Sequence, residues 1–156
     1  MARTGDELVN PVSGERIVFL RTAADTEGRL LEMDDFWTRP AHRTLEHIHP
    51  EMQERWEVIA GRVCFRVAGV ERIAGPGEVV IAPAGVPHMA WSSDGAPVHL
   101  RIQMRPALRW ERFVERLFGL ARDGHTDERG MPTPALMVEL LCEFPREIAP
   151  ALSTGT

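Results

Sequence analysis

The chain from residue 15 to residue 105 is a series of short hydrophobic stretches, most of them separated by glycine or proline. Strands that recur every 8–12 residues or so, with turn residues between them, are typical of antiparallel sandwiches and barrels. We expect strands over residues 15–21, 29–38, 43–49, 56–59, 62–67, 71–74, 78–82, 88–91 and 97–105. The sequence therefore predicts a mostly β domain.

The hydrophobic pattern changes after Pro106. Apolar residues then recur at helical spacing, which indicates an amphipathic helix; they are Trp110, Phe113, Val114, Leu117, Phe118 and Ala121. We expect this helix over residues 107–122 and a second one over residues 134–144. Residues 1–105 are thus predicted to form the β domain, and residues 106–156 a helical extension packed on it. A lid over the domain or a homodimer contact is the alternative use of the apolar helix faces.

Composition limits the partners of this chain. Its 156 residues correspond to one domain, and its formal net charge of −5 is opposite to what phosphate binding requires, so we expect no nucleic-acid partner. No stretch approaches the ~18 consecutive apolar residues that would indicate a membrane span. The first ten residues contain no hydrophobic run, and Cys64 and Cys142 are too few for a disulfide framework. These features predict a cytoplasmic protein.

Two residue types are missing from the sequence. All 18 basic residues are arginine, so chemistry that proceeds through a lysine Schiff base is excluded. There is no tyrosine either, so no phenol can act as a general acid. Catalysis, if any, must use histidine, carboxylates or a metal.

A histidine and glutamate cluster is the first candidate for such chemistry. His47 and His49 are separated by one residue, so on a strand their side chains point to the same side. Glu54 would face the other way on a continuous strand, but Pro50 interrupts the ladder and permits a turn that brings Glu54 back. Imidazole and carboxylate groups that converge in this way can bind a divalent transition metal.

A second motif supplies a fourth candidate ligand, His88. This motif runs over residues 77–92, with Gly77, Pro83 and Gly85 at fixed spacing before His88. Together with residues 47–61, where Gly61 follows Glu54 after six intervening residues, it resembles the paired motif of the cupin family. The family's second motif ends in Asn, and Ser92 stands at that position here.

The resemblance implies a fold and a cofactor. The expected fold is the antiparallel double-stranded β-helix, the jelly-roll barrel of RmlC-like cupins, here with a C-terminal pair of helices. The expected cofactor is one divalent transition-metal ion, namely Fe, Mn, Ni, Co, Cu or Zn, held inside the barrel. Its ligands would be His47, His49, Glu54 and His88.

The two-residue period of a strand also predicts which residues share the ligand face. A first set should line a substrate pocket beside the metal: Arg43, Leu45, Trp56, Val58 and Ala90. On the last strand, His99, Arg101 and Gln103 face the cavity if the alternating apolar residues pack elsewhere, and they face solvent in the opposite assignment. His42 and His125 lie among polar residues and are expected at the surface.

Two classes of function agree with these features. One is a metal-dependent oxidoreductase of dioxygenase type that acts on a small enolic or aromatic substrate, with Glu54 as the catalytic base; an isomerase or lyase is a variant of it. The other is a cupin that binds a metal and a small molecule without turnover.

Overall fold

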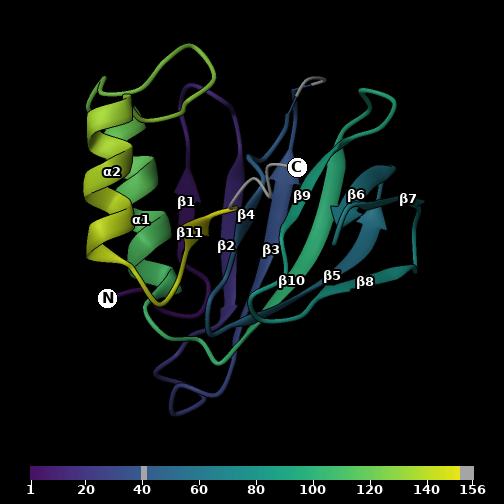
Figure 1. The fold of residues 1–156 in the computed structure, drawn as a ribbon, viewed down its shortest axis with the longest axis horizontal. Coiled ribbons are helices and arrows are strands. Elements are labelled where there is room, and N and C mark those ends of the chain that lie inside the picture. The colour runs from purple at the N-terminus through teal and green to yellow at the C-terminus, as the bar shows by residue number, and fades with distance from the viewer. Residues whose placement is uncertain (40–41, 152–156) are drawn as a thin grey trace, which may run out of the picture.

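Two antiparallel β-sheets form most of the protein, as the computed structural model of residues 1–39 and 42–151 shows (Figure 1). The larger sheet has the strand order β1 (Glu7–Val9), β2 (Arg16–Arg21), β3 (Leu31–Trp37), β10 (Val98–Arg105), β5 (Gln53–Ala60) and β8 (Val79–Ala82). The smaller sheet has the order β11 (Ala149–Pro150), β4 (His47–Ile48), β9 (His88–Ser92), β6 (Val63–Val67) and β7 (Val70–Ala74). The predicted jelly-roll class is confirmed, but no strand pairing across the described residues closes the two sheets into one barrel.

The strand before the first motif differs most from the prediction. Residues 43–49 were expected to be one strand, whereas only His47–Ile48 pairs as β4, and Arg43 makes an isolated bridge with Trp91. Two short strands were missed, β1 and β11. They lie at the edges of the two sheets, where few side chains are buried and the hydrophobic signal is correspondingly weak.

Inward-facing and outward-facing side chains alternate along the central strands, and the inward-facing ones form the core. On β10, Val98, Leu100, Ile102 and Met104 are buried and point inward. The inward residues of the facing sheet include Val63, Phe65 and Ala90. These apolar faces join one hydrophobic core, which leaves the polar faces of the strands to solvent.

The structure explains why one position of the first motif is glycine. Gly61 joins β5 to β6 with a φ of 85°, a backbone conformation that other residues rarely adopt. A Cβ atom at this position would lie 2.5 Å from the carbonyl oxygen of Pro97. The hairpin therefore requires glycine here.

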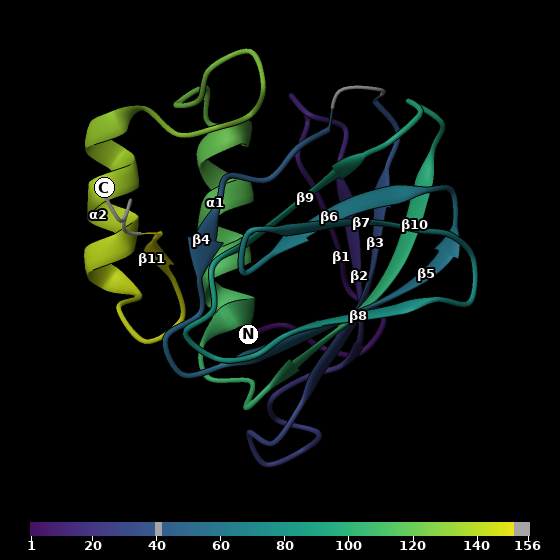
Figure 2. The same cartoon turned by 45° about the vertical axis from the view of Figure 1, so that its right-hand side comes forward.

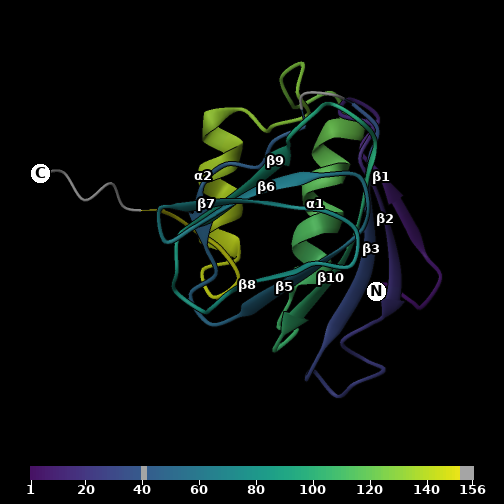
Figure 3. The ribbon, with the colours of Figure 1, turned by 90° about the vertical axis from the view of Figure 1, so that its right-hand side faces the viewer.

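The helices α1 (Trp110–Arg122) and α2 (Pro134–Glu143) lie on one side of the sheets, with α1 the nearer of the two (Figure 2). Apolar residues of α1, including Phe113 and Phe118, join the same core as the strands. After α2 the chain returns to the smaller sheet, where β11 pairs with β4. When the view of Figure 1 is turned by 90° about the vertical axis, both helices lie behind the strands of the smaller sheet (Figure 3). No helix in the described part of the chain is long and apolar enough to cross a membrane.

Candidate metal centre

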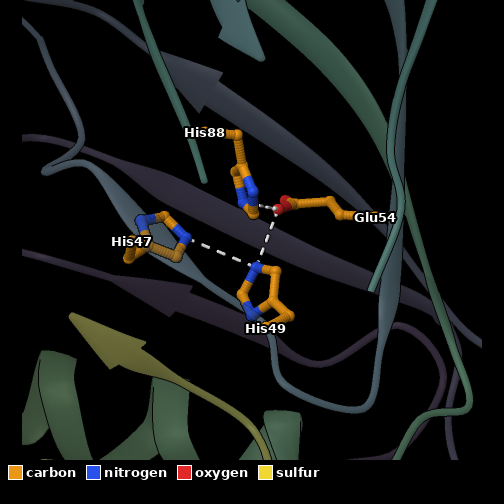
Figure 4. A group of neighbouring side chains, drawn as sticks. All are labelled: His47, His49, Glu54 and His88. Atoms are coloured by element: carbon orange, nitrogen blue, oxygen red, sulfur yellow. Dashed lines mark hydrogen bonds and ion pairs between the residues drawn. The ribbon is translucent and has the colours of Figure 1, made fainter. Parts of the chain in front are cut away.

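Four side chains from separate segments converge between the sheets: His47, His49, Glu54 and His88 (Figure 4). Each offers one ligand atom, and these atoms all lie within 4.8 Å of one another. Strand register explains part of this arrangement, because His47 on β4 is paired directly with His88 on β9. Glu54 comes from β5 in the opposite sheet, so both sheets contribute to the cluster.

The carboxylate of Glu54 is the centre of the contacts. Its Oε2 atom lies 2.9 Å from Nε2 of His49 and 3.1 Å from Nε2 of His88. The Nε2 atom of His47 lies 3.3 Å from that of His49. All three imidazoles thus direct the same ring nitrogen toward one region.

Backbone carbonyls fix this orientation from outside the cluster. The Nδ1 atom of His47 donates to the carbonyl of Leu45 at 2.6 Å, that of His88 to Val86 at 2.9 Å, and that of His49 to Glu147 at 2.7 Å. Because a carbonyl only accepts, each Nδ1 carries a proton and each Nε2 faces the cluster. There the Nε2 of His49 or His88 donates to Glu54 when it is protonated, and each Nε2 can bind a metal when it is not. Metal-binding histidines are commonly oriented in this way. The donor set therefore fits a divalent transition metal.

The electrostatics of the cluster agree with a cation site. Burial would raise the pKa of Glu54, but hydrogen bonds from His49 and His88 outweigh it and hold that pKa well below its usual range. Burial and the neighbouring imidazoles lower the pKa of His47 to about 3. Burial would also lower the pKa of His88, yet its bond to Glu54 raises it. Glu54 is thus an anion facing imidazoles, and a central cation would satisfy the whole group.

A family comparison now identifies the domain. Residues 38–102 match the family model described as "Cupin domain", and this match includes all four converging residues. The chain contains a cupin domain. Comparison with curated proteins gives no match.

Solved cupin-like structures agree with this assignment. KdgF from a Halomonas species is 16% identical, covers 63% of this chain and 85% of its own, and superposes with a TM-score of 0.55. An RmlC-like cupin from Shewanella frigidimarina is 18% identical over 67% of this chain and 86% of its own, with a TM-score of 0.56. A predicted oxalate decarboxylase from Thermotoga maritima is 13% identical over 68% and 98%, with a TM-score of 0.57. At these low sequence identities, the similarity shows a shared fold and does not show a shared function.

The cluster of four converging side chains adjoins a cavity of about 680 Å³. His47, Glu54 and His88 form part of its wall, and the rest of the wall is mainly apolar. Strands supply Ile17, Met33, Trp56, Ala90 and Ile102, whereas α1 supplies Trp110, Phe113, Val114, Leu117 and Phe118. The helix therefore closes a side of the cavity that the two sheets leave open.

The first set of predicted pocket residues is mostly found at this cavity. Arg43, Leu45, Trp56 and Ala90 line it, with Leu45 largely exposed at the surface. Val58 does not line it. That side chain is fully buried in the core between the sheets.

The predicted pocket residues on β10 lie elsewhere. His99, Arg101 and Gln103 occupy the outer face of the larger sheet, because their apolar neighbours fill the inner face. Arg101 donates to Asp34 at 3.0 and 3.2 Å, and Gln103 donates to Glu32. The cavity-facing assignment of these three residues is therefore wrong, and the opposite one describes the structure.

Other cavity residues were not anticipated from the sequence. His42 was expected at the surface, but its side chain is only 11% exposed and its ring stacks on Trp37 at 4.5 Å. Glu15 and Asp35 also line the cavity. The sequence signal that could have found Asp35 is its inward register on β3, between the apolar residues Met33 and Trp37.

Proposed function

We propose that this cupin binds one divalent transition metal through His47, His49, Glu54 and His88 and is a metal-dependent enzyme. The proposed reaction class is an oxidoreductase of dioxygenase type, acting on a small enolic or aromatic substrate. One observation carries the proposal: three oriented imidazoles and a carboxylate adjoin an apolar cavity of about 680 Å³. Cavities of this size and character are typical of small-molecule sites.

The wall of the cavity favours a flat, hydrophobic substrate. Trp56 lies beside His88, with ring centroids 5.3 Å apart, and Trp110 lies beside His49 at 4.8 Å. Trp110 in turn stacks on Phe113. These rings offer stacking partners to an aromatic substrate and keep water away from the histidines.

The charge of the centre favours an anionic or ionisable substrate group. A bound divalent metal would supply Lewis acidity, which stabilises an enolate or phenolate oxygen. With three neutral imidazoles and one carboxylate around it, the site would keep about one net positive charge. We assign Glu54 as the base that accepts the proton that such a substrate loses, once its carboxylate has left the metal.

The test is oxygen consumption by the metal-loaded protein. Protein reconstituted separately with Fe, Mn, Ni, Co, Cu or Zn would be assayed with a panel of catechols, hydroxylated aromatic acids and enols. We expect oxygen uptake with at least one pairing and none with the His49→Ala variant. Substrate conversion without oxygen uptake would favour an isomerase or lyase. Saturable binding without conversion would favour a binding protein.

A further inference from the structure

Two acidic side chains from neighbouring strands lie on the wall of the cavity, Glu15 and Asp35. Asp35 on β3 is paired with Ile17 on β2, and Glu15 precedes Ile17 by two residues. Glu15 is therefore the diagonal neighbour of Asp35 on the same inward face of the sheet. Asp35 is 4% exposed, and the side chain of Glu15 is 18% exposed.

The hydrogen bonding of Asp35 is incomplete. Its Oδ2 atom accepts a bond of 2.9 Å from Nε1 of Trp37. Its Oδ1 atom is buried and has no donor among the described residues. A buried carboxylate oxygen without a donor is costly, so this atom is poised to accept a hydrogen bond from a group that enters the cavity.

Arg39, Arg43 and Arg129 also line the cavity, but none of them forms an ion pair with these acids. Within the described residues, no arginine lies in ion-pair distance of Glu15 or Asp35. His42 lies with Nε2 3.9 Å from Oε2 of Glu15, but burial lowers its pKa to about 4 and leaves it neutral at pH 7. The two acids thus form a pair without a counter-ion.

Both acids have raised pKa values when no ligand is present. Burial raises the pKa of Asp35 to about 7, to which the charge of Glu54 adds, while the bond from Trp37 and the nearby carboxyl group of Glu15 act the other way. Burial and the negative charge of Asp35 raise the pKa of Glu15 well above its usual range. The two acids are therefore protonated over a higher pH range than ordinary carboxyl groups when no ligand is present.

We propose that Glu15 and Asp35 form a second binding site in the cavity, which takes a cationic, hydrogen-bond-donating group of the substrate such as an ammonium. An ammonium carries three donors and one positive charge, so it can satisfy Oδ1 of Asp35 and neutralise the pair. The anionic end of the same molecule would lie at the metal centre. In that respect the inference rests on the proposed function, and it narrows the substrate class to compounds with an anionic oxygen and a cationic group.

A matched pair of small probes tests the acidic site alone. Dissociation constants for benzylamine and benzyl alcohol, measured by NMR titration at pH 7, compare an ammonium with a neutral hydroxyl on the same ring. We expect benzylamine to bind at least about tenfold more tightly to the wild-type protein, the size of one charge-assisted hydrogen bond. In the Glu15→Gln/Asp35→Asn variant the two probes should bind equally.

Glu128→Gln is the control for this variant, because Glu128 is an exposed acid on the rim of the same cavity. It should keep the preference for benzylamine. If the wild-type protein shows no preference, or if the double variant keeps it, the proposal is overturned. Thermal unfolding of the double variant, and the two single variants, would show that any loss is not caused by misfolding.

Proton release gives a second, independent readout. Because raised pKa values keep protons on the free pair near pH 7, binding of benzylamine should release protons, which calorimetry in buffers of different ionisation enthalpy would measure. The double variant should release none. Adding a carboxylate, in 4-(aminomethyl)benzoate, should tighten binding further only in metal-loaded protein. If 4-(aminomethyl)benzoate binds metal-loaded protein no more tightly than benzylamine does, the result counts against the proposed function. The comparison of benzylamine with benzyl alcohol tests the acidic site separately.

Discussion

The Nδ1 atom of His49 donates a hydrogen bond of 2.7 Å to the backbone carbonyl of Glu147, a residue 98 positions later in the chain. This contact makes the C-terminal segment a structural part of the candidate metal centre. Glu147 itself is fully buried, and its carboxylate accepts bonds from the backbone N and the Nε of Arg109 at the start of α1. The helical extension therefore supports His49 as well as covering the cavity.

Replacing Glu147 with alanine should weaken the metal site from outside. The variant would leave the backbone N–H of Arg109 without its acceptor and would loosen the segment that orients His49. We expect a loss of about 1–3 kcal/mol in the free energy of unfolding. We also expect roughly 10–100-fold weaker metal binding, as for other groups that orient a ligand.

Urea unfolding and metal competition titrations would measure these two effects. Glu143→Ala is the matched control, since Glu143 is an exposed acid at the end of α2. It should change both quantities little. Unchanged metal affinity in Glu147→Ala would contradict the role given to this contact.

Loss of one imidazole should abolish metal binding. In His88→Ala protein the remaining donors no longer surround the central region, so elemental analysis after reconstitution should find most of the metal gone. His125→Ala serves as the control, because His125 is exposed and is not one of the four converging residues. It should bind as much metal as the wild-type protein. Equal metal content in the two variants would argue against the centre.

The pKa of Asp35 predicts a pH dependence of stability. Because its pKa is raised from 3.8 to about 7 by burial, the folded protein binds more protons than the unfolded chain between these values. The free energy of unfolding therefore falls as pH rises from about 4 to about 7. The Asp35→Asn variant lacks the titrating group and should not lose this stability. Between about pH 4 and about pH 7, its free energy of unfolding should therefore rise relative to that of the wild type by more than about 1 kcal/mol.

Urea unfolding in the presence of a chelator at pH 4.5 and pH 7.5 would check this expectation. The exposed residue Asp123 provides the control Asp123→Asn. That variant should follow the wild-type pH dependence. A constant difference between Asp35→Asn and wild type at both pH values would contradict the raised pKa.

The outward position of Arg101 predicts that this residue is dispensable for ligand binding. Its side chain pairs with Asp34 on the outer face of the larger sheet and is 38% exposed. Arg101→Ala should therefore change stability by less than about 1 kcal/mol and leave affinity for cavity ligands unaltered. Trp56→Ala, which removes a cavity wall beside His88, should weaken the binding of aromatic ligands. NMR titration of 4-methylbenzoate into both variants would test the contrast, and weaker binding to Arg101→Ala would contradict it.

Local patterns in the sequence were sufficient to predict the converging residues. His47, His49, Glu54 and His88 occupy the ligand positions of the paired motif, so the spacing and the family resemblance identified them together. The helix α1 was also predictable, because its apolar spacing reflects a single buried face, whereas α2 buries only Leu140 fully.

Features that depend on distant contacts were not predictable in the same way. A strand with apolar residues on one side and polar residues on the other has two possible orientations, and only the facing sheet decided that His99 points outward. The carbonyl of Glu147 and the pairing of Glu15 with Asp35 depend on tertiary packing of remote segments. The alternation along β3 indicates that Asp35 faces inward, but nothing in the sequence indicates its neighbour Glu15 or the contact of Glu147 with His49.

Four side chains from both sheets are proposed to bind one divalent metal. X-ray absorption spectroscopy of the protein reconstituted with a single metal tests this most directly, because it reports the ligand types and their distances. We predict close to one ion per chain, with three imidazole nitrogens at about 2.0–2.1 Å and a carboxylate oxygen at about 2.0–2.2 Å. A metal surrounded only by water oxygens, or a spectrum left unchanged by His88→Ala, would contradict it.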